Sequence, residues 1–292
     1  MEHAAAHEET SGKRRATLYV VATPIGNLAD LSQRALETLG SVDAVAAEDT
    51  RVTRRLLAHY GIAKRLIAVH EHNEKRAVGS ILALLRDGRS VALTCDAGTP
   101  AISDPGALLV AAARAAGFPV TPVPGPNAAI VALSASGFAA PHHLFYGFLP
   151  ERAAARRRAL AALAQLPFTL VFYEAPHRVE ECVSDLCAVL GKKRRIVLAR
   201  ELTKLFESLH ACTLAEAGDW LAADPMRRKG EFVLIVEGAA GTPAANDTGQ
   251  RALEVLLGEL PLRQAVNLAA RITGERKNEL YRAALAMKKG DS

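Results

Sequence analysis

Two loops rich in glycine and proline, each placed directly after a short apolar run, constrain the fold of this chain most. Residues 94–106 read TCDAGTPAISDPG and follow Val91–Leu93, and residues 122–127 read PVPGPN and follow a run that begins at Pro119. Short apolar runs bounded by turn residues are typical of buried strands. Because a helical pattern follows each loop, the sequence predicts repeated strand–loop–helix units of an α/β sheet. Ligands of such sheets bind outside the carboxyl ends of the strands, where these loops lie.

Two aspartates predict helix starts. Asp104 followed by Pro105 predicts the start of a helix that runs through Ala107–Ala116, because a carboxylate can cap free amides and proline suits the first helical position. Asp30 is predicted to cap a helix that runs to about Leu39, with Gln33 as its capping-box partner. Both predictions rest on neighbours within a few residues along the chain.

The pattern of the sequence divides the chain into four parts. Residues 1–16 mix acidic and basic groups without an apolar segment, which predicts a disordered tail and not a signal peptide. Residues 17–122 predict an α/β domain, and residues 123–240 predict a second α/β domain with a mixed sheet, because its strands are closely spaced. One of those strands is predicted over Leu205–Cys212. Residues 241–292 predict a linker and a small helical module.

Composition and missing motifs exclude several classes of protein. The chain has 292 residues, half of them hydrophobic, which suits a globular protein of two domains. No apolar run approaches the roughly 20 residues of a membrane span, so we expect a cytoplasmic protein. The motifs of phosphate-binding loops, of dinucleotide-binding loops and of zinc proteases are absent. The four cysteines form no metal-ligand pattern, so we expect buried thiols and no metal site.

Basic residues are clustered although the formal net charge is only +5. The clusters are Arg152 with Arg156–Arg158, Lys192–Arg195, Arg227–Lys229 and the scattered Lys and Arg residues after Gly249. Such patches can attract a polyanion such as a nucleic acid. Charge alone leaves a set of solvated surfaces as an equal alternative.

Eight motifs, taken in order, resemble one family. They are VATPIGNLAD at 21–30, AEDTR at 47–51, DAGTPAISDPG at 96–106, PVPGPNAA at 122–129, GFLP at 147–150, FYEAPHR at 172–178, LARELTK at 198–204 and KGEFVLIVEG at 229–238. Together they resemble the tetrapyrrole methylase superfamily, and within it the members that methylate RNA of the small ribosomal subunit. The resemblance covers about residues 17–238, and those members share a C-terminal helical extension. One departure is Cys95, where relatives often have serine or glycine.

The resemblance implies both a fold and a reaction. The implied fold has two α/β domains with S-adenosylmethionine in the cleft between them, in a protein that is usually a homodimer. The implied reaction is methylation of a cytidine ribose 2′-hydroxyl in 16S rRNA of the small ribosomal subunit, at the decoding region. S-adenosylmethionine carries no phosphate, so the absence of a phosphate-binding loop is consistent with this cofactor.

The resemblance also implies the cofactor-binding residues. For the methionine and ribose portions they are Asp96, Ala97, Gly98, Thr99 and Ile102, with Pro24 at the end of the first strand. For the adenine they are Tyr173 and Glu174 together with Pro124, Gly125 and Pro126. Single residues also have structural explanations, because an aspartate can cap a turn and a proline can start a helix.

Methyl transfer is an in-line displacement, in which alignment contributes heavily and a positioned base assists a weakly acidic hydroxyl. The candidate bases carried by the motifs are Asp49, Glu201 and Lys229. Each has another explanation: Asp49 as a helix cap, Glu201 in an ion pair with Arg200, and Lys229 as a phosphate ligand.

We expect the basic clusters and the C-terminal helices to hold the RNA, because phosphate neutralisation supplies most sequence-independent affinity. Aromatic residues form only 5% of the chain, so stacking of bases on an aromatic platform is not expected. Two alternatives from other classes stay open. One is a precorrin-type tetrapyrrole C-methyltransferase, which has no use for the basic clusters. The other is a non-catalytic RNA-binding protein, which leaves the paired loops unexplained.

Overall fold

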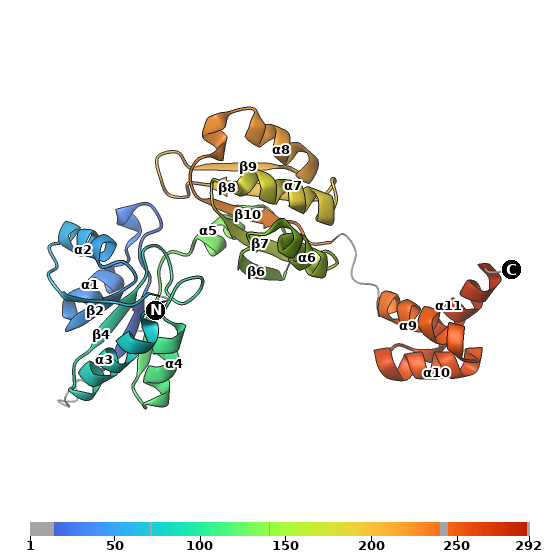
Figure 1. Cartoon of the computed structure of the whole chain (residues 1–292), viewed down its shortest axis with the longest axis horizontal. Helices are drawn as coiled ribbons and strands as arrows, with labels where there is room; N and C mark the ends of the chain where they lie inside the picture. Colours follow the sequence, from blue (N-terminus) through green and yellow to red (C-terminus); the bar gives the residue numbers. More distant parts are fainter. Residues whose placement is uncertain (1–14, 71, 140, 240–244, 291–292) are drawn as a thin grey trace, which may run out of the picture. The chain divides into compact units, whose positions relative to one another are not determined.

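The computed structural model describes residues 15–70, 72–139, 141–239 and 245–290, so most of the predicted N-terminal tail lies outside the described residues. Contacts divide the chain into two compact units (Figure 1). The first unit contains the chain up to Ala135 together with Ala199–Ser208, and the second contains Ser136–Leu198 and the chain from Leu209 onward. Each unit has its own sheet, which confirms the predicted α/β class. The predicted domain boundaries after residues 122 and 240 stay predictions.

The sheet of the first unit is entirely parallel, with the order β3-β2-β4-β1-β5. Its strands are β1 (Leu18–Val21), β2 (Ala44–Ala47), β3 (Arg65–Ala68), β4 (Val91–Thr94) and β5 (Val120–Val123). The interior strands β2 and β4 are buried at every position, as is usual for apolar runs covered on both faces. In a parallel sheet the loops that follow the strands gather at one edge, which we call the carboxyl edge.

Helices cover both faces of this sheet. They are α1 (Gln33–Ser41), α2 (Thr50–His59), α3 (Glu74–Arg86), α4 (Ala107–Ala115) and α5 (Ala128–Ser134), with a short 3-10 helix η1 (Leu28–Asp30) before α1. One apolar cluster joins Leu93 of the sheet to Ile81 of α3 and Leu109 of α4. The other joins Val45 to residues of α1 and α2 on the opposite face. Alternate side chains of each strand therefore anchor different helices.

Both predicted aspartate caps are wrong. Asp30 is the last residue of η1, and α1 is capped by Ser32, whose Oγ accepts from Ala35 N at 3.1 Å. The helix predicted over Ala107–Ala116 forms as α4, but Gly106 and not Asp104 lies at its N-cap position.

A distant glutamate caps α4 in place of Asp104. Buried Glu74, the first residue of α3, accepts through Oε1 from the amides of Gly106 at 2.9 Å, Leu108 at 3.1 Å and Leu109 at 3.4 Å. A carboxylate at a helix N-terminus is stabilised by both the free amides and the helix dipole. The start of α4 is therefore fixed by tertiary structure.

The second unit has a mixed sheet with the order β6-β7-β10-β8-β9, as predicted. Its strands are β6 (His143–Phe148), β7 (Thr169–Glu174), β8 (Arg195–Arg200), β9 (Ser208–Thr213) and β10 (Phe232–Val236). Three helices, α6 (Ala153–Leu163), α7 (Val179–Leu190) and α8 (Leu214–Ala222), pack on it, and a 3-10 helix η2 (Pro225–Arg228) follows α8. The strand predicted over Leu205–Cys212 begins only at Ser208, so residues 205–207 belong to the preceding loop.

The C-terminal helical module is confirmed. Helices α9 (Ala245–Glu259), α10 (Leu262–Thr273) and α11 (Lys277–Gly290) pack around a small core that includes Leu253, Val266 and Leu280. Gly274 adopts the left-handed conformation in the turn between α10 and α11. The four cysteines are free, two of them buried and two half-buried. In the described part of the chain, no helix combines the length and the apolar character that a membrane span requires.

Candidate functional site

The carboxyl edge of the first sheet brings together most of the predicted cofactor residues. Pro24 follows β1, residues 96–102 follow β4, and residues 124–126 follow β5, while β1 lies between β4 and β5 in the sheet. Residues 96, 97, 102, 124 and 125 are exposed, so backbone groups of two loops are open to a ligand. The first unit by itself therefore has the geometry of a ligand site at the ends of parallel strands.

Hydrogen bonds join the loop after β4 to the segment that follows β1. Thr23 N donates to Gly98 O at 2.8 Å, Gly98 N donates to Thr23 O at 3.0 Å, and Thr23 Oγ1 donates to Cys95 O at 3.1 Å. Gly98 has φ of 84°, which residues with a side chain adopt only at a cost. This two-bond bridge fixes the position of the exposed Asp96 and Ala97.

The loop after β5 is held equally closely. A Cβ atom on Gly125 would lie 2.9 Å from Cβ of Ala22, so only glycine lets these backbones approach each other. Thr99 Oγ1 donates to Pro126 O at 3.0 Å, and Asn127 caps α5 by accepting from Ile130 N. The three loops therefore form one interlocked surface.

Three carboxylic acids lie at this edge in an environment that disfavours their charge. Asp96 Oδ1 accepts from Asp49 N at 3.0 Å, and Asp96 N donates to Glu48 Oε2 at 3.4 Å. Burial is the main cause that raises the pKa values of Glu48, Asp96 and Asp104, and repulsion from neighbouring carboxylates adds to it. Repulsion between the carboxylates is the smaller cause, and Arg51 already offsets part of it at Asp96.

Asp49 is already engaged by its own helix and by an arginine. Its side chain accepts from Arg51 N and forms an ion pair with Arg51 at 2.6 Å. The hydrogen bond from the Arg51 side chain is the main cause that lowers the pKa of Asp49 to about 2. A carboxylate with a lowered pKa is a weak base, which favours the capping role over the catalytic one. The assignment of Asp49 as a base stays a prediction.

The other two candidate bases belong to different units. Glu201 lies in Ala199–Ser208 of the first unit, with φ of 52° and an ion pair from Oε1 to Lys204 Nζ at 2.9 Å. Lys229 is exposed in the second unit, directly after η2. A Cβ atom on Gly26 would lie 2.5 Å from Cγ of Lys204, so the Glu201 loop packs on the loop that follows β1.

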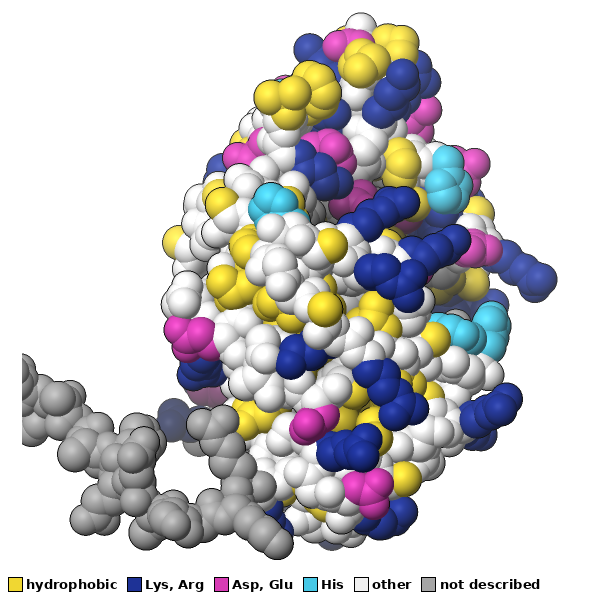
Figure 2. Space-filling view, turned by 90° about the vertical axis from the view of Figure 1, so that its left-hand side faces the viewer, with side chains coloured by type: hydrophobic (Ala, Val, Ile, Leu, Met, Phe, Trp, Pro, Cys, Tyr) yellow, Lys and Arg dark blue, Asp and Glu magenta, His cyan; other side chains and the backbone are white. Residues whose placement is uncertain are grey.

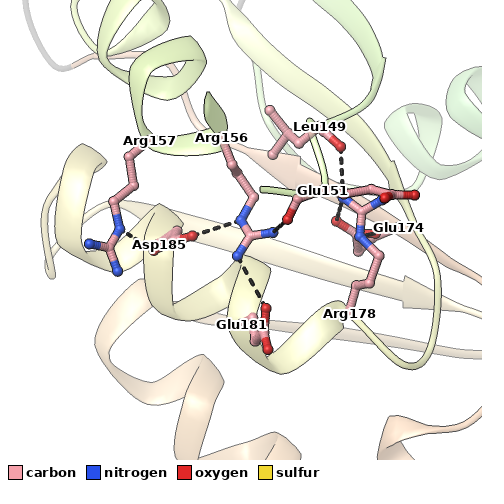
Figure 3. A network of polar contacts seen from close by, with 8 residues as sticks. All are labelled: Leu149, Glu151, Arg156, Arg157, Glu174, Arg178, Glu181 and Asp185. Carbon is pink, nitrogen blue, oxygen red and sulfur yellow. Dashed lines mark hydrogen bonds and ion pairs between the residues drawn. The ribbon is translucent and has the colours of Figure 1, made fainter. Parts of the chain in front are cut away.

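The second unit contains Tyr173 and Glu174, and the Glu174 carboxylate is fully engaged (Figure 3). Glu174 is 2% exposed, forms an ion pair with Arg178 at 3.2 Å and accepts from Ala175 N at 2.9 Å. Arg178 Nη2 also donates to Leu149 O at 2.6 Å, which ties two of the eight motifs together. Arg178, held by Glu174, thus bonds the backbone of the loop at residues 147–150, and the contact of Glu174 with adenine stays a prediction.

Parts of the predicted basic clusters are structural (Figure 3). Arg156 is 1% exposed and is held by Asp185 at 2.7 Å, Glu151 O at 2.9 Å and Glu181 at 3.4 Å. Arg194 donates to the carbonyl groups of Glu237, Ala164 and Leu166. These two guanidinium groups cannot serve as solvated contacts for a polyanion.

A different group of cations lies beside the carboxyl edge. Helix α2 starts directly after β2 and exposes Arg51, Arg54 and Arg55. Lys and Arg side chains are spread over much of the face shown in Figure 2. The basic clusters predicted from the sequence did not include these arginines, which are Arg51 and the adjacent pair Arg54–Arg55. Arg54 and Arg55 follow Arg51 by three and four residues, a spacing that places all three on one side of a helix and that could have identified this group.

Comparison with known proteins gives two family matches. The family described as Tetrapyrrole (Corrin/Porphyrin) Methylases matches residues 17–218, and the family described as RsmI C-terminal HTH domain matches residues 243–288. Among solved structures, cobalt precorrin-4 methyltransferase is 18% identical, with a TM-score of 0.59 over 79% of this chain and 98% of that chain. The uroporphyrin-III-C-methyltransferase from Thermus thermophilus is 23% identical, with a TM-score of 0.53 over 76% of this chain and 94% of that chain. These two structures show the fold.

Curated relatives extend the likeness over nearly the whole chain. The protein named ribosomal RNA small subunit methyltransferase I of Escherichia coli O157:H7 is 50% identical over 95% of this chain and 97% of the relative. The protein of the same name from Xylella fastidiosa strain Temecula1 is 54% identical over 91% of this chain and 97% of the relative.

Proposed function

This chain belongs to the tetrapyrrole methylase family, within its ribosomal RNA small subunit methyltransferase I group, and from that membership we propose its reaction. The protein transfers a methyl group from S-adenosylmethionine to the 2′-hydroxyl of a cytidine ribose in 16S rRNA, at the decoding region. It acts in the cytoplasm as a homodimer on the small ribosomal subunit. Identity of 50% or more to two relatives of that name carries the proposal.

The carboxyl edge of the first sheet fits S-adenosylmethionine, whose sulfonium makes the bound methyl group electrophilic. Exposed backbone at residues 96–97 and 124–125 can bind the uncharged and zwitterionic parts of the cofactor without a phosphate-binding loop. Glu48, Asp96 and Asp104 match a positive charge. We propose Pro24, Asp96–Thr99, Ile102 and Pro124–Pro126 as contacts, and Tyr173 and Glu174 as the adenine side.

Glu201 fits the role of base better than Asp49. Its loop packs on Gly26, two residues from Pro24, whereas Asp49 caps α2 and has its pKa lowered to about 2. We propose that Glu201 accepts the proton of the ribose hydroxyl and that Lys204 holds its carboxylate in place at 2.9 Å. Lys229 is exposed, so we propose that it binds an RNA phosphate.

The reaction is tested with methyl-labelled S-adenosylmethionine and small ribosomal subunits that lack the modification. A 2′-O-methyl group blocks alkaline cleavage of the next phosphodiester, so the label should appear in an alkali-resistant dinucleotide. Label in an added precorrin, with none in RNA, would instead support the tetrapyrrole alternative. Retained RNA affinity without any transfer would identify a non-catalytic RNA-binding protein.

Acid should reduce the preference of the site for the charged cofactor. Carboxylic acids with raised pKa values gain protons at a higher pH than ordinary ones, and each proton removes a negative charge that faces the sulfonium. S-adenosylhomocysteine has no sulfonium and serves as the matched control. Calorimetry from pH 7.5 downward should show the affinity ratio of the two ligands falling, by about fivefold for each charge removed, since one charge at about 8 Å contributes ~1 kcal/mol at an effective dielectric constant of about 40. A ratio that does not change with pH would contradict this account of the carboxylates.

Removal of the C-terminal module should weaken RNA binding and leave cofactor binding intact. Truncation after Gly241 keeps the contacts that end the second unit, including Arg194 Nε to Glu237 O at 2.7 Å and Ala239 N to Leu166 O at 2.8 Å. It deletes exposed Lys277, Tyr281 and Arg282 of α11. We expect KM for small subunits to rise about tenfold or more, because each lost phosphate contact weakens binding. Unchanged methylation of subunits by the truncated protein would refute this role.

A further inference from the structure

The loop between β8 and β9 exposes two apolar side chains that the proposed reaction leaves unexplained. Leu205 is 90% exposed and Phe206 is 62% exposed. An exposed Leu–Phe pair at a loop tip has an energetic cost in water, since burial of such side chains is favourable. Residues 205 and 206 were predicted to lie in a strand, where one of the two would have been covered.

The loop is rigidly built. Arg200 donates from Nη2 to Phe206 O at 3.0 Å and from Nε to Ser208 Oγ at 3.2 Å. The Glu207 carboxylate accepts from Thr203 N, and the Lys204–Glu201 pair closes the other side. These bonds fix the backbone that carries the two apolar side chains, so the tip is presented in one conformation.

Backbone strain coincides with this loop. In the part of the chain that the structure describes, the non-glycine residues with positive φ are Ala101, Glu201 and Thr203. Two of them flank Leu202 in this loop, and the third lies in the loop after β4 at the carboxyl edge. Such conformations persist only where the surroundings impose them, and they concentrate at functional sites.

The loop also packs directly on the carboxyl edge. A Cβ atom on Gly26 would lie 2.9 Å from Leu202 O and 2.9 Å from Thr203 Oγ1, so the two backbones touch. Gly26 follows Pro24 by two residues in the loop after β1. The residues just before the Leu205–Phe206 tip therefore pack on a loop that belongs to the surface proposed for the methyl donor.

We propose that Phe206 stacks on an unpaired nucleobase beside the target ribose and so positions the acceptor strand, with Leu205 covering the edge of that base. This inference rests on the proposed function. Single-stranded RNA is commonly recognised by bases that stack on aromatic side chains, and one ring fits one base. Two side chains are too small a surface for a stable protein interface, which needs about 800 Å² on each partner.

Kinetics on small ribosomal subunits test Phe206 as a positioning residue. Phe206→Ala should raise KM for subunits by about 5- to 150-fold, the effect of losing one base stack, with kcat changed far less. The affinity of Phe206→Ala for S-adenosylhomocysteine should stay within about twofold of the affinity of the unmodified protein. Phe206→Tyr should restore KM because it keeps the ring, whereas Phe206→Leu should not. Leu209→Ala, an exposed apolar residue of β9 outside the loop, is the control.

Three outcomes would overturn the inference. They are an unchanged KM in Phe206→Ala, full recovery by Phe206→Leu, and a change in sedimentation of Phe206→Ala that identifies the tip as an interface between copies. If the unmodified protein methylates subunits and Phe206→Ala has the same KM, the stacking is refuted and the proposed function stands. An unmodified protein that neither methylates nor binds subunits refutes the proposed function, and the stacking with it.

Discussion

Replacement of Asp185 by alanine should destabilise the second unit by about 3–5 kcal/mol, the range observed when one partner of a buried ion pair is removed. Asp185 is 3% exposed and accepts from Arg156 Nε at 2.7 Å and also from Arg157 Nε. Burial acts to raise the pKa of Asp185, but the hydrogen bonds from Arg157 and Arg156 outweigh it and lower the pKa. Without Asp185, the charge of Arg156 stays buried with only Glu151 O and the exposed Glu181 as partners.

Urea unfolding followed by the fluorescence of Trp220 measures this effect. The chain has a single tryptophan, and it lies on α8 of the second unit, so the signal reports that unit selectively. Glu181→Ala is the matched control and should cost less than about 1 kcal/mol, because the Glu181 side chain is 76% exposed. Arg156→Met combined with Asp185→Leu should recover most of the loss. A free energy of unfolding of Asp185→Ala within about 1 kcal/mol of the unmodified protein would contradict the role given to this pair.

Gly98→Val should abolish measurable binding of S-adenosylmethionine, with a loss of at least about 100-fold. A β-branched residue is a genuine outlier at φ of 84°, and strain of this kind costs on the order of 1–3 kcal/mol. The Cβ atom itself would make an ordinary contact with Cγ2 of Ile25 at 3.5 Å, so the expected effect comes from the backbone conformation. The bridge between Thr23 and Gly98 should break, and Asp96 and Ala97 should move with it.

Gly88→Val provides the matched control for this prediction. Gly88 has φ of 79° in the turn between α3 and β4, and no atom lies within 4 Å of its Cβ position. It imposes the same local strain before the amino end of β4, whereas the carboxyl-edge loops follow the other ends of the strands, so it should lower stability and leave cofactor affinity unchanged. Calorimetric titration of both variants, after circular dichroism has shown that they are folded, separates the two effects. Equal affinity of Gly98→Val and the unmodified protein would refute the importance of the bridge.

Sequence patterns predicted the elements well where local signals determine them. The helix predicted over Ala107–Ala116 forms over Ala107–Ala115, because apolar periodicity acts within one element. The order of the strands and their loops was sufficient to predict the carboxyl edge as a ligand site.

The features that the sequence did not predict depend on residues far apart in the chain. Glu74 caps α4 from another helix, and Arg156 is buried because Asp185 lies opposite it. The strand predicted to begin at Leu205 begins at Ser208. The prediction was wrong at this end because an alternating pattern cannot distinguish an exposed loop tip from the start of an edge strand. The structural role of Glu174 was also not predicted, since its partner Arg178 must be brought near by the turn after β7.

A crystal structure of the full chain with S-adenosylhomocysteine would show whether the methyl donor binds at the carboxyl edge of the first sheet. We expect ordered ligand in contact with the backbone of residues 96–99 and 124–126, near the carboxylates of Glu48 and Asp104. Fully occupied ligand that touches neither loop would contradict the account.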